Sequence, residues 1–207
     1  MERRTQADRS AATRAALVTA GRELFATHGF NGVGTEALTS AANVSRGALY
    51  HQYGDKVELF ASVLTTVESE VTERVAAEAL SSGETEFAGL MRAALDSWFD
   101  ACEAPEVQRI VLLDGPAVLG WARWRELCQP YILDLIEGLL RQAIDDGSIE
   151  ALPTRPLAHA LVAMADEAAL YVLAADDRPR ARAEMSQVFH RLAAGLVTAT
   201  ADPCHDR

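Results

Sequence analysis

The fold is constrained most by residues 35–53, which have the pattern of two short helices joined by a tight corner. The first helix is expected to begin near Thr35, whose hydroxyl can cap it, and Ser45 is expected to cap the second. Asn43 lies where the corner needs a left-handed backbone conformation, which asparagine tolerates better than most residues other than glycine. Apolar side chains at helical spacing would hold the pair together: Leu38, Ala42, Val44 and Leu49. The pattern predicts a helix-turn-helix.

The rest of the chain also has helical periodicity, and no segment shows the sustained alternation of a β-strand. A first helix is expected over residues 7–27, and Asp55 with Glu58 has the spacing of a capping box at the start of a long fourth helix. Apolar spacing and glycine or proline breaks predict later helices over residues 84–102, 106–113, 118–146, 154–175 and 179–200. The expected fold is all-α with about nine helices: an N-terminal three-helix domain (7–54), a C-terminal helical domain (55–200) and a flexible tail (201–207).

Charge is distributed unevenly along the chain. The net charge is −11, which by itself argues against nucleic acid as a partner. Residues 1–60 carry a net charge of +1, however, whereas the remainder carries −12. Phosphate binding depends on local positive charge, and charges beyond a screening length of about 10 Å contribute little. The N-terminal part can therefore contact DNA.

Several other classes of protein lack support in the sequence. The longest fully apolar run, residues 168–175, is far shorter than the roughly 20 residues that span a bilayer, so we expect a cytoplasmic protein with no membrane partner. Three scattered cysteines favour neither a disulfide framework nor a zinc ribbon, and no metal or cofactor is expected. No nucleophile elbow, phosphate loop, dinucleotide fingerprint or zinc-protease motif is present. We therefore expect no catalytic residues and no enzyme activity.

Residues 20–60 resemble the DNA-binding segment of the TetR family of transcriptional regulators. The family pattern is a helix ending in Phe-x-x-x-Gly-(Phe/Tyr), an Ala-Ala-Gly-Val-Ser corner, and then Gly-x-Leu-Tyr-x-x-Phe-x-x-Lys. The matching segments here are Phe25–Phe30, Leu38–Ser45 and Gly47–Lys56. Asn43 replaces the usual glycine and Tyr53 the usual phenylalanine, and both changes are physically tolerable. The resemblance implies an N-terminal DNA-binding domain and a C-terminal domain for dimerisation and effector binding.

The resemblance also implies a set of DNA-binding residues. Arg46 is the best candidate for a bidentate contact to guanine, and Thr35 and Lys56 would clamp phosphates at helix N-termini. Gly47 would let the backbone approach the duplex closely. Two alternatives stay open, since Tyr50 can be half-buried core instead of a DNA contact and His51 can be an idle surface residue. The full expected set is Thr35, Ser45, Arg46, Gly47, Tyr50, His51 and Lys56.

The N-terminal arginines and the last two helices carry further expectations. Arg3, Arg4 and Arg9 either form an arm along the DNA or a solvated tail. Residues 154–175 are rich in small residues and residues 179–200 have an apolar face, so two such hairpins can pair into a four-helix bundle about a two-fold axis. TetR-type proteins dimerise there; the alternative is an intramolecular core. A homodimer would also present two recognition helices to a palindromic operator in double-stranded DNA.

Aromatic and polar residues of the C-terminal part suggest a small-molecule site. An aromatic cavity with a few polar groups suits such a ligand, although the same spacing is typical of an ordinary core. The acidic pair Asp166–Glu167 interrupts an apolar helix; it can face solvent, pair with arginine across a dimer, or bind a cationic, lipophilic effector. The expected ligand-binding residues are Trp98, Phe99, Trp121, Trp124, Tyr131, Asp166 and Tyr171.

The sequence thus predicts a ligand-responsive transcriptional regulator. We expect a repressor that binds a palindromic operator as a dimer and is released by a small lipophilic effector. Two alternatives remain: a helical small-molecule-binding or enzymatic dimer without DNA function, and a transcriptional activator of the same fold.

Overall fold

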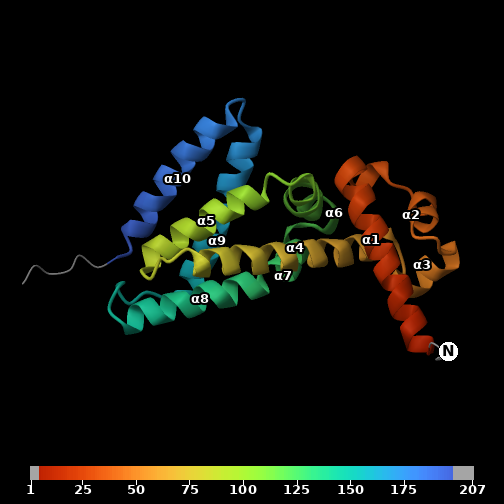
Figure 1. Cartoon of the computed structure of the whole chain (residues 1–207), viewed down its shortest axis with the longest axis horizontal. Helices are drawn as coiled ribbons and strands as arrows, with labels where there is room; N and C mark the ends of the chain where they lie inside the picture. Colours follow the sequence, from red (N-terminus) through yellow and green to blue (C-terminus); the bar gives the residue numbers. More distant parts are fainter. Residues whose placement is uncertain (1–4, 198–207) are drawn as a thin grey trace, which may run out of the picture. The chain divides into compact units, whose positions relative to one another are not determined.

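The computed structural model describes residues 5–197, which form ten α-helices and one π-helix (Figure 1). The expected all-α class is confirmed, because the only β feature in this range is an isolated antiparallel bridge between Ile149 and Val197. The elements are α1 (Gln6–Gly32), α2 (Thr35–Ala41), α3 (Arg46–Tyr53), α4 (Lys56–Ser81), α5 (Phe87–Ala101), the π-helix η1 (Val107–Asp114), α6 (Gly115–Leu119), α7 (Trp121–Cys128), α8 (Pro130–Asp145), α9 (Thr154–Ala174) and α10 (Arg178–Ala194).

The chain divides into two compact units. The first contains the residues up to Glu73 together with Asp100–Pro130, and the second contains Arg74–Phe99 and the residues from Tyr131 onward. The first unit thus holds α1–α3, most of α4, η1, α6 and α7, and the second holds most of α5 with α8–α10. This division by contacts differs from the functional boundary expected at residue 54, which stays a prediction.

Helix α1 is closed at one end by a cap and broken near the other by a glycine. The Thr5 hydroxyl accepts a hydrogen bond from the Asp8 backbone, and the Asp8 carboxylate accepts one from the Thr5 backbone. The helix extends beyond its expected end at residue 27: Gly29 interrupts it with φ 69° and ψ 168°, after which a helical turn resumes to Gly32. A Cβ at Gly29 would collide with the Arg109 side chain. Gly29 therefore serves both the backbone kink and a close contact with η1.

An aromatic cluster forms the centre of the first unit. The rings of Phe25, Phe30 and Phe60 have centroid separations of 5.2–5.9 Å, and Phe60 and Phe25 are fully buried. A Cβ at Gly21 would lie 2.9 Å from Val63, so the missing side chain allows α1 and α4 to pack closely. Helix α4 therefore packs on the N-terminal helices through Phe60.

The corner between α2 and α3 forms largely as expected. Asn43 has φ 52° and is the only residue other than glycine in the described range with a positive φ. Leu38 and Leu49 are fully buried between the helices. The Ser45 hydroxyl caps α3 by accepting from the Ala48 amide at 3.2 Å. The expected Thr35 cap is wrong, because Thr35 is already the first helical residue and the cap position is Gly34, which has no side chain.

Later helix boundaries differ from the expected ones. The single helix predicted over residues 118–146 is three pieces, because Gly120 adopts φ 77° and Pro130 starts a new helix. Proline lacks an amide proton and its ring clashes with the preceding turn, so α7 cannot continue through it. The helix predicted over 106–113 is a π-helix over Val107–Asp114. The last helix ends at Ala194, and residues 198–200 of its expected range lie outside the described part.

Ionic contacts attach η1 to α1 within the first unit. Arg22 donates from Nε and Nη2 to the Glu106 carboxylate at 2.6 and 2.8 Å, and its Nη1 lies 2.7 Å from Glu70 of α4. The hydrogen bond with Glu106 raises the pKa of Arg22 above its ordinary value. Burial opposes this increase in the pKa, and the contact with Glu70 adds to it. At the other end of η1, the Asp114 carboxylate accepts from the Phe30 amide at 2.7 Å. The second half of α1 is therefore held near both ends of η1.

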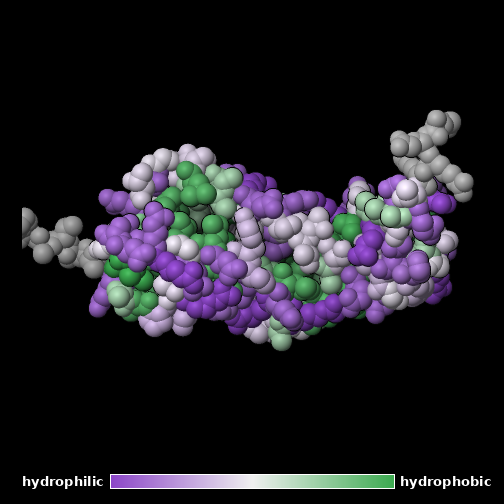
Figure 2. Space-filling model, turned by 90° about the horizontal axis from the view of Figure 1, so that it is seen from below, coloured by the Kyte–Doolittle hydropathy of each residue, from purple (hydrophilic) through white to green (hydrophobic). Residues whose placement is uncertain are grey.

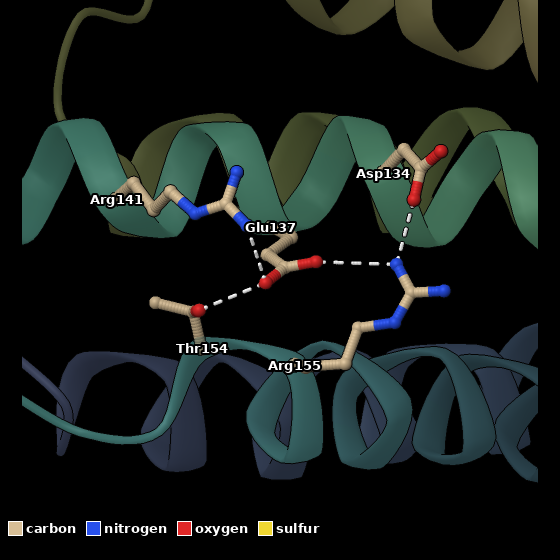
Figure 3. A network of polar contacts seen from close by, with 5 residues as sticks. All are labelled: Asp134, Glu137, Arg141, Thr154 and Arg155. Carbon is tan, nitrogen blue, oxygen red and sulfur yellow. Dashed lines mark hydrogen bonds and ion pairs between the residues drawn. The ribbon is translucent and has the colours of Figure 1, made fainter.

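A polar network joins α8 to α9 in the second unit (Figure 3). The buried carboxylate of Glu137 accepts hydrogen bonds from Arg141 at 2.7 Å, Thr154 at 3.0 Å and Arg155 at 3.1 Å. Arg155 also donates to Asp134 at 2.6 Å. Burial raises the pKa of Glu137, but the hydrogen bonds from Thr154 and Arg155 outweigh it, so the net pKa is lowered. The network fixes the first turn of α9 on α8.

Candidate nucleic-acid interface

Helix α3 separates a buried face from an exposed one. Leu49 and Tyr53 point into the first unit and are buried. The opposite face carries the five residues expected to meet DNA from this helix and its cap, all of them exposed: Ser45, Arg46, Gly47, Tyr50 and His51. Tyr50 is 41% exposed, which places it on the surface and not in the core. The outer side of α3 is thus a continuous polar surface with a cation and a phenol.

Gly47 leaves open space on this surface. A Cβ at Gly47 would meet nothing closer than the Ser45 hydroxyl, 3.9 Å away. Packing within the protein therefore does not require a glycine here. Its absence of a side chain favours the close backbone approach expected from the sequence.

Arg46 and Tyr50 contact each other on the exposed side of α3. The Arg46 Nη2 donates to the Tyr50 hydroxyl at 3.3 Å, and the guanidinium carbon lies 5.6 Å from the centroid of the Tyr50 ring. The contact with Arg46 lowers the pKa of Tyr50, with a smaller lowering from the Thr35 side chain, and the contact with Tyr50 raises the pKa of Arg46. Two of the expected DNA-binding side chains are therefore linked to one another.

Helix α3 is also tied to α1 by contacts that the sequence analysis did not find. The Gln52 amide donates to the Ser10 hydroxyl at 3.0 Å, and the Tyr53 hydroxyl donates to the Arg14 carbonyl at 3.3 Å. The Arg14 guanidinium lies 5.0 Å from the centre of the Tyr53 ring. The hydroxyl of Tyr53, where the family pattern has phenylalanine, thus has a partner on α1. Its departure from the pattern was the only signal in the sequence.

Lys56 points toward the interior of the domain. Its Nζ donates to the Phe30 carbonyl at 3.0 Å and to the Val33 carbonyl at 2.9 Å, and lies 3.9 Å from the centre of the Phe30 ring. These contacts satisfy two of the three ammonium protons. Lys56 therefore joins the start of α4 to the kinked end of α1. A role of Lys56 in phosphate binding stays a prediction, and only the third ammonium proton would be available to donate to a phosphate.

Other basic and acidic residues near the motif have defined positions. Arg9 is exposed on α1, while Arg3 and Arg4 lie outside the described residues. The expected capping box at α4 is present in its first half, because Asp55 accepts from the Glu58 amide at 2.9 Å. The Glu58 carboxylate binds Arg123 of α7 at 2.7 Å.

The tryptophans Trp121 and Trp124, expected to bind a ligand, lie in the first unit. Trp124 is buried and donates to the Val111 carbonyl at 3.0 Å. Trp121 is 60% exposed, stacks on Trp124 at 4.9 Å and lies under the Arg125 guanidinium. Both rings are thus engaged in packing within α7 and η1.

The other five expected ligand-binding residues lie in the second unit. Phe99 is buried beneath the Arg182 guanidinium, which is 5.5 Å from its ring centre, and Trp98 donates to the Ala165 carbonyl at 3.1 Å. Asp166 is half-buried on α9, while Tyr131 and Tyr171 are exposed. An open groove of about 590 Å³ runs along α10 and is lined by Ala183, Ser186, Gln187, His190, Arg191 and Ala194. None of the seven residues expected to bind a ligand lines this groove, and the ligand-binding role of those seven stays a prediction.

An all-helical fold with an exposed second helix in a helix-turn-helix is typical of DNA-binding regulators. Comparison with known proteins identifies the family: this chain belongs to the TetR family of transcriptional regulators. Residues 17–63 match the family model of bacterial regulatory proteins of the tetR family, and residues 89–196 match that of the tetracyclin repressor-like C-terminal domain. The protein is therefore a transcriptional regulator and not an enzyme.

Individual relatives agree with the family. The HTH-type transcriptional activator FasR of Mycolicibacterium smegmatis is 28% identical over 80% of this chain and 74% of its own length. The HTH-type transcriptional repressor Rv1474c of Mycobacterium tuberculosis is 33% identical over 56% of this chain and 59% of its own length. A TetR-family regulator from Pectobacterium atrosepticum has a solved structure that is 28% identical, with a TM-score of 0.79 over 95% of this chain and 99% of that one.

Proposed function

We propose that this protein is a cytoplasmic, dimeric repressor that binds a palindromic operator and is released by a small lipophilic effector. The observation that carries the proposal is the exposed polar face of α3, with Arg46 and Tyr50 raised above the buried Leu49 and Tyr53. A helix with this division can enter the major groove with its outer side while its inner side holds it to the domain. The relative Rv1474c, named as a repressor, supports the direction of regulation.

The surface of α9 and α10 supports dimerisation there. Helix α9 is the one described helix long and apolar enough to cross a membrane by length and composition, a test that core helices of soluble proteins also pass. Only 28% of its apolar stretch is buried within the protomer. Tyr171, Val188 and Leu192 are between 49% and 55% exposed, and hydrophobic residues gather over the second unit in the left half of Figure 2. A second copy of the chain would remove this surface from water.

The face of α10 available to a partner is narrower than the sequence suggested. Phe189 is buried within the protomer and Met185 is half-buried, so these residues belong to the intramolecular core. Val188 and Leu192 lie on the exposed side together with Gly195. On α9, small exposed residues, Ala160, Ala163 and Ala174, would permit close approach of the partner helix.

A mobility-shift assay on the DNA upstream of the protein's own coding sequence tests the proposal. We expect a shifted complex whose affinity falls steeply with salt, because phosphate contacts release counterions. Arg46→Ala should cost about 1–3 kcal/mol on the operator and relax the sequence preference. Equal losses for Arg46→Ala on operator and random DNA would contradict the assigned role. A transcription assay from the same promoter then separates repression from activation, the alternative that the name of FasR suggests.

The effector proposal concerns the second unit. Support comes from the aromatic residues of α5, Trp98 and Phe99, and from the half-buried Asp166 of α9, whose neighbour Ala165 accepts the Trp98 hydrogen bond. Aromatic rings with an acid suit a lipophilic cation. Titration of lipophilic cations should change tryptophan fluorescence and weaken the DNA complex. Tight binding of lipophilic anions alone would contradict the cationic class.

A further inference from the structure

The Tyr50 side chain contacts Arg46 through both its hydroxyl and its ring. The hydroxyl accepts from Arg46, one helical turn earlier on α3, at 3.3 Å. The ring lies below the Arg46 guanidinium, 5.6 Å from its carbon. The Arg46 guanidinium therefore has two kinds of contact with one neighbouring side chain.

Such a contact changes what Arg46 contributes to binding. An exposed arginine samples many rotamers, and fixing it on DNA costs side-chain entropy. A neutral hydroxyl and a ring face restrict these rotamers without neutralising the charge, whereas a carboxylate partner would. The contact with Tyr50 uses one of the five guanidinium N–H groups, so a bidentate fork can still reach a base.

We propose that Tyr50 is a positioning residue, which holds the Arg46 guanidinium in the orientation that reads the operator. The proposal rests on the proposed function. It differs from the expectation that Tyr50 itself contacts a phosphate or a base. Tyr50 then sets sequence preference through Arg46, and its removal affects operator binding more than binding to random DNA.

A double-mutant cycle on Arg46→Ala and Tyr50→Phe tests the coupling, with operator and random duplexes of equal length. Tyr50→Phe keeps the ring and removes the hydroxyl, so the domain should fold as before. We expect it to lower the ratio of operator to random affinity by about three- to tenfold, the range for one hydrogen bond. Random-DNA affinity should stay within about twofold, and Tyr50→Phe should have no further effect when Arg46 is already alanine.

In the free protein, absorbance titration of the phenol, with Tyr50→Phe as the blank, should show a lowered pKa that rises in Arg46→Ala. This measurement reports the contact without DNA.

The outcomes separate this inference from the function on which it rests. Additive losses in the cycle, or an equal loss from Tyr50→Phe on both duplexes, would overturn the positioning role and indicate a direct phosphate contact. Wild-type protein that prefers no palindrome over random DNA would overturn the proposed function and this role together. A phenol pKa that does not respond to Arg46→Ala would show that the contact itself is absent in solution, which also overturns the inference.

Discussion

Gly47 is predicted to serve DNA binding through its missing side chain, at no benefit to stability. Its helical position has open space around it, so Gly47→Ala should fold normally and gain up to about 1 kcal/mol in helix propensity. The added methyl would stand between the α3 backbone and the duplex. We expect about a tenfold loss of operator affinity, or about 1.4 kcal/mol, measured by mobility shift beside a urea unfolding curve.

A second glycine provides the matched comparison. Gly54 also has open space around it but has φ 79°, a conformation that L side chains rarely adopt. Gly54→Ala should therefore lower the unfolding free energy by about 1 kcal/mol, the opposite sign to Gly47→Ala. Loss of stability in Gly47→Ala would contradict the account given for that position.

Lys56 is expected to stabilise the DNA-binding domain as well as any complex with DNA. Lys56→Met keeps the aliphatic stem and removes the ammonium that binds two carbonyls, so it should lower the unfolding free energy by about 1–3 kcal/mol. Urea denaturation measures the change. Arg46→Ala, which removes an exposed cation from the same domain, should change stability by no more than about 0.5 kcal/mol. Equal stability of Lys56→Met and wild type would exclude the internal role.

Local chemistry decided which residues were predictable. Asn43 and Ser45 were placed correctly because a left-handed corner and a helix cap are properties of neighbouring backbone. Thr35 was misplaced by one position, since Gly34 can take the cap conformation without a side chain. The contacts of Lys56 and Tyr53 were missed because their partners, on α1, lie more than twenty residues away in sequence.

At the scale of elements, the α8–α9 junction should make stability depend on acid. The pKa of Glu137 is lowered in the folded protein, so its contribution is complete above the unfolded value of about 4.3 and is lost as pH falls through the folded value. Glu137→Gln should lower the unfolding free energy at pH 7, because Arg141 and Arg155 lose their charged partner. Urea unfolding at pH 7 and at pH 3 measures both effects.

The difference in unfolding free energy between wild type and Glu137→Gln tests whether Glu137 causes the dependence on pH. Because the amide does not titrate, the gap in unfolding free energy between wild type and Glu137→Gln should narrow as pH falls below about 4.3. A gap that stays constant down to pH 3 would show that Glu137 does not titrate differently in the folded state. Glu150, an exposed acid in the same unit, is a suitable control for substitution by glutamine.

Element type was easier to predict than element continuity. Helical periodicity gave the all-α class and most starting points, because it depends on residues three and four apart. It did not reveal that Gly120 would adopt a positive φ, since glycine is also tolerated inside helices. Nor did it distinguish the π-helix at Val107–Asp114, whose packing against α1 depends on Arg22 and Asp114 contacts between distant segments.

For the whole molecule, the exposed side of α9 and α10 predicts a concentration-dependent dimer. Leu192→Glu would place a charge in the contact between copies and should give a monomer in sedimentation experiments at micromolar concentration. Operator affinity should fall as well, because a monomer presents one recognition helix. Leu113→Glu changes a similarly exposed leucine on η1 in the other unit and should remain dimeric. A dimeric Leu192→Glu would exclude this face.

The exposure of the residues expected to bind DNA could be predicted from sequence better than the exposure of the residues expected to bind an effector. All residues of the first set come from one contiguous motif of about twenty residues, so their neighbours on the helix define their exposure. The aromatic residues expected to bind the effector are spread over α5, α7, α8 and α9, and their exposed fractions range from 3% for Phe99 to 60% for Trp121. Which of them face a common space depends on packing between helices, which spacing along the chain does not encode.

The inward position of Lys56 also allows local opening of the domain to be measured by proteolysis. Lys56 is the only lysine in the sequence, so an endoprotease specific for lysine can cut at one peptide bond, at the first residue of α4. In the folded protein that side chain is held by two carbonyls of the α1–α2 segment. Cleavage therefore requires this contact to open. The cleavage rate, followed on a gel, then measures how often the start of α4 separates from the α1–α2 segment.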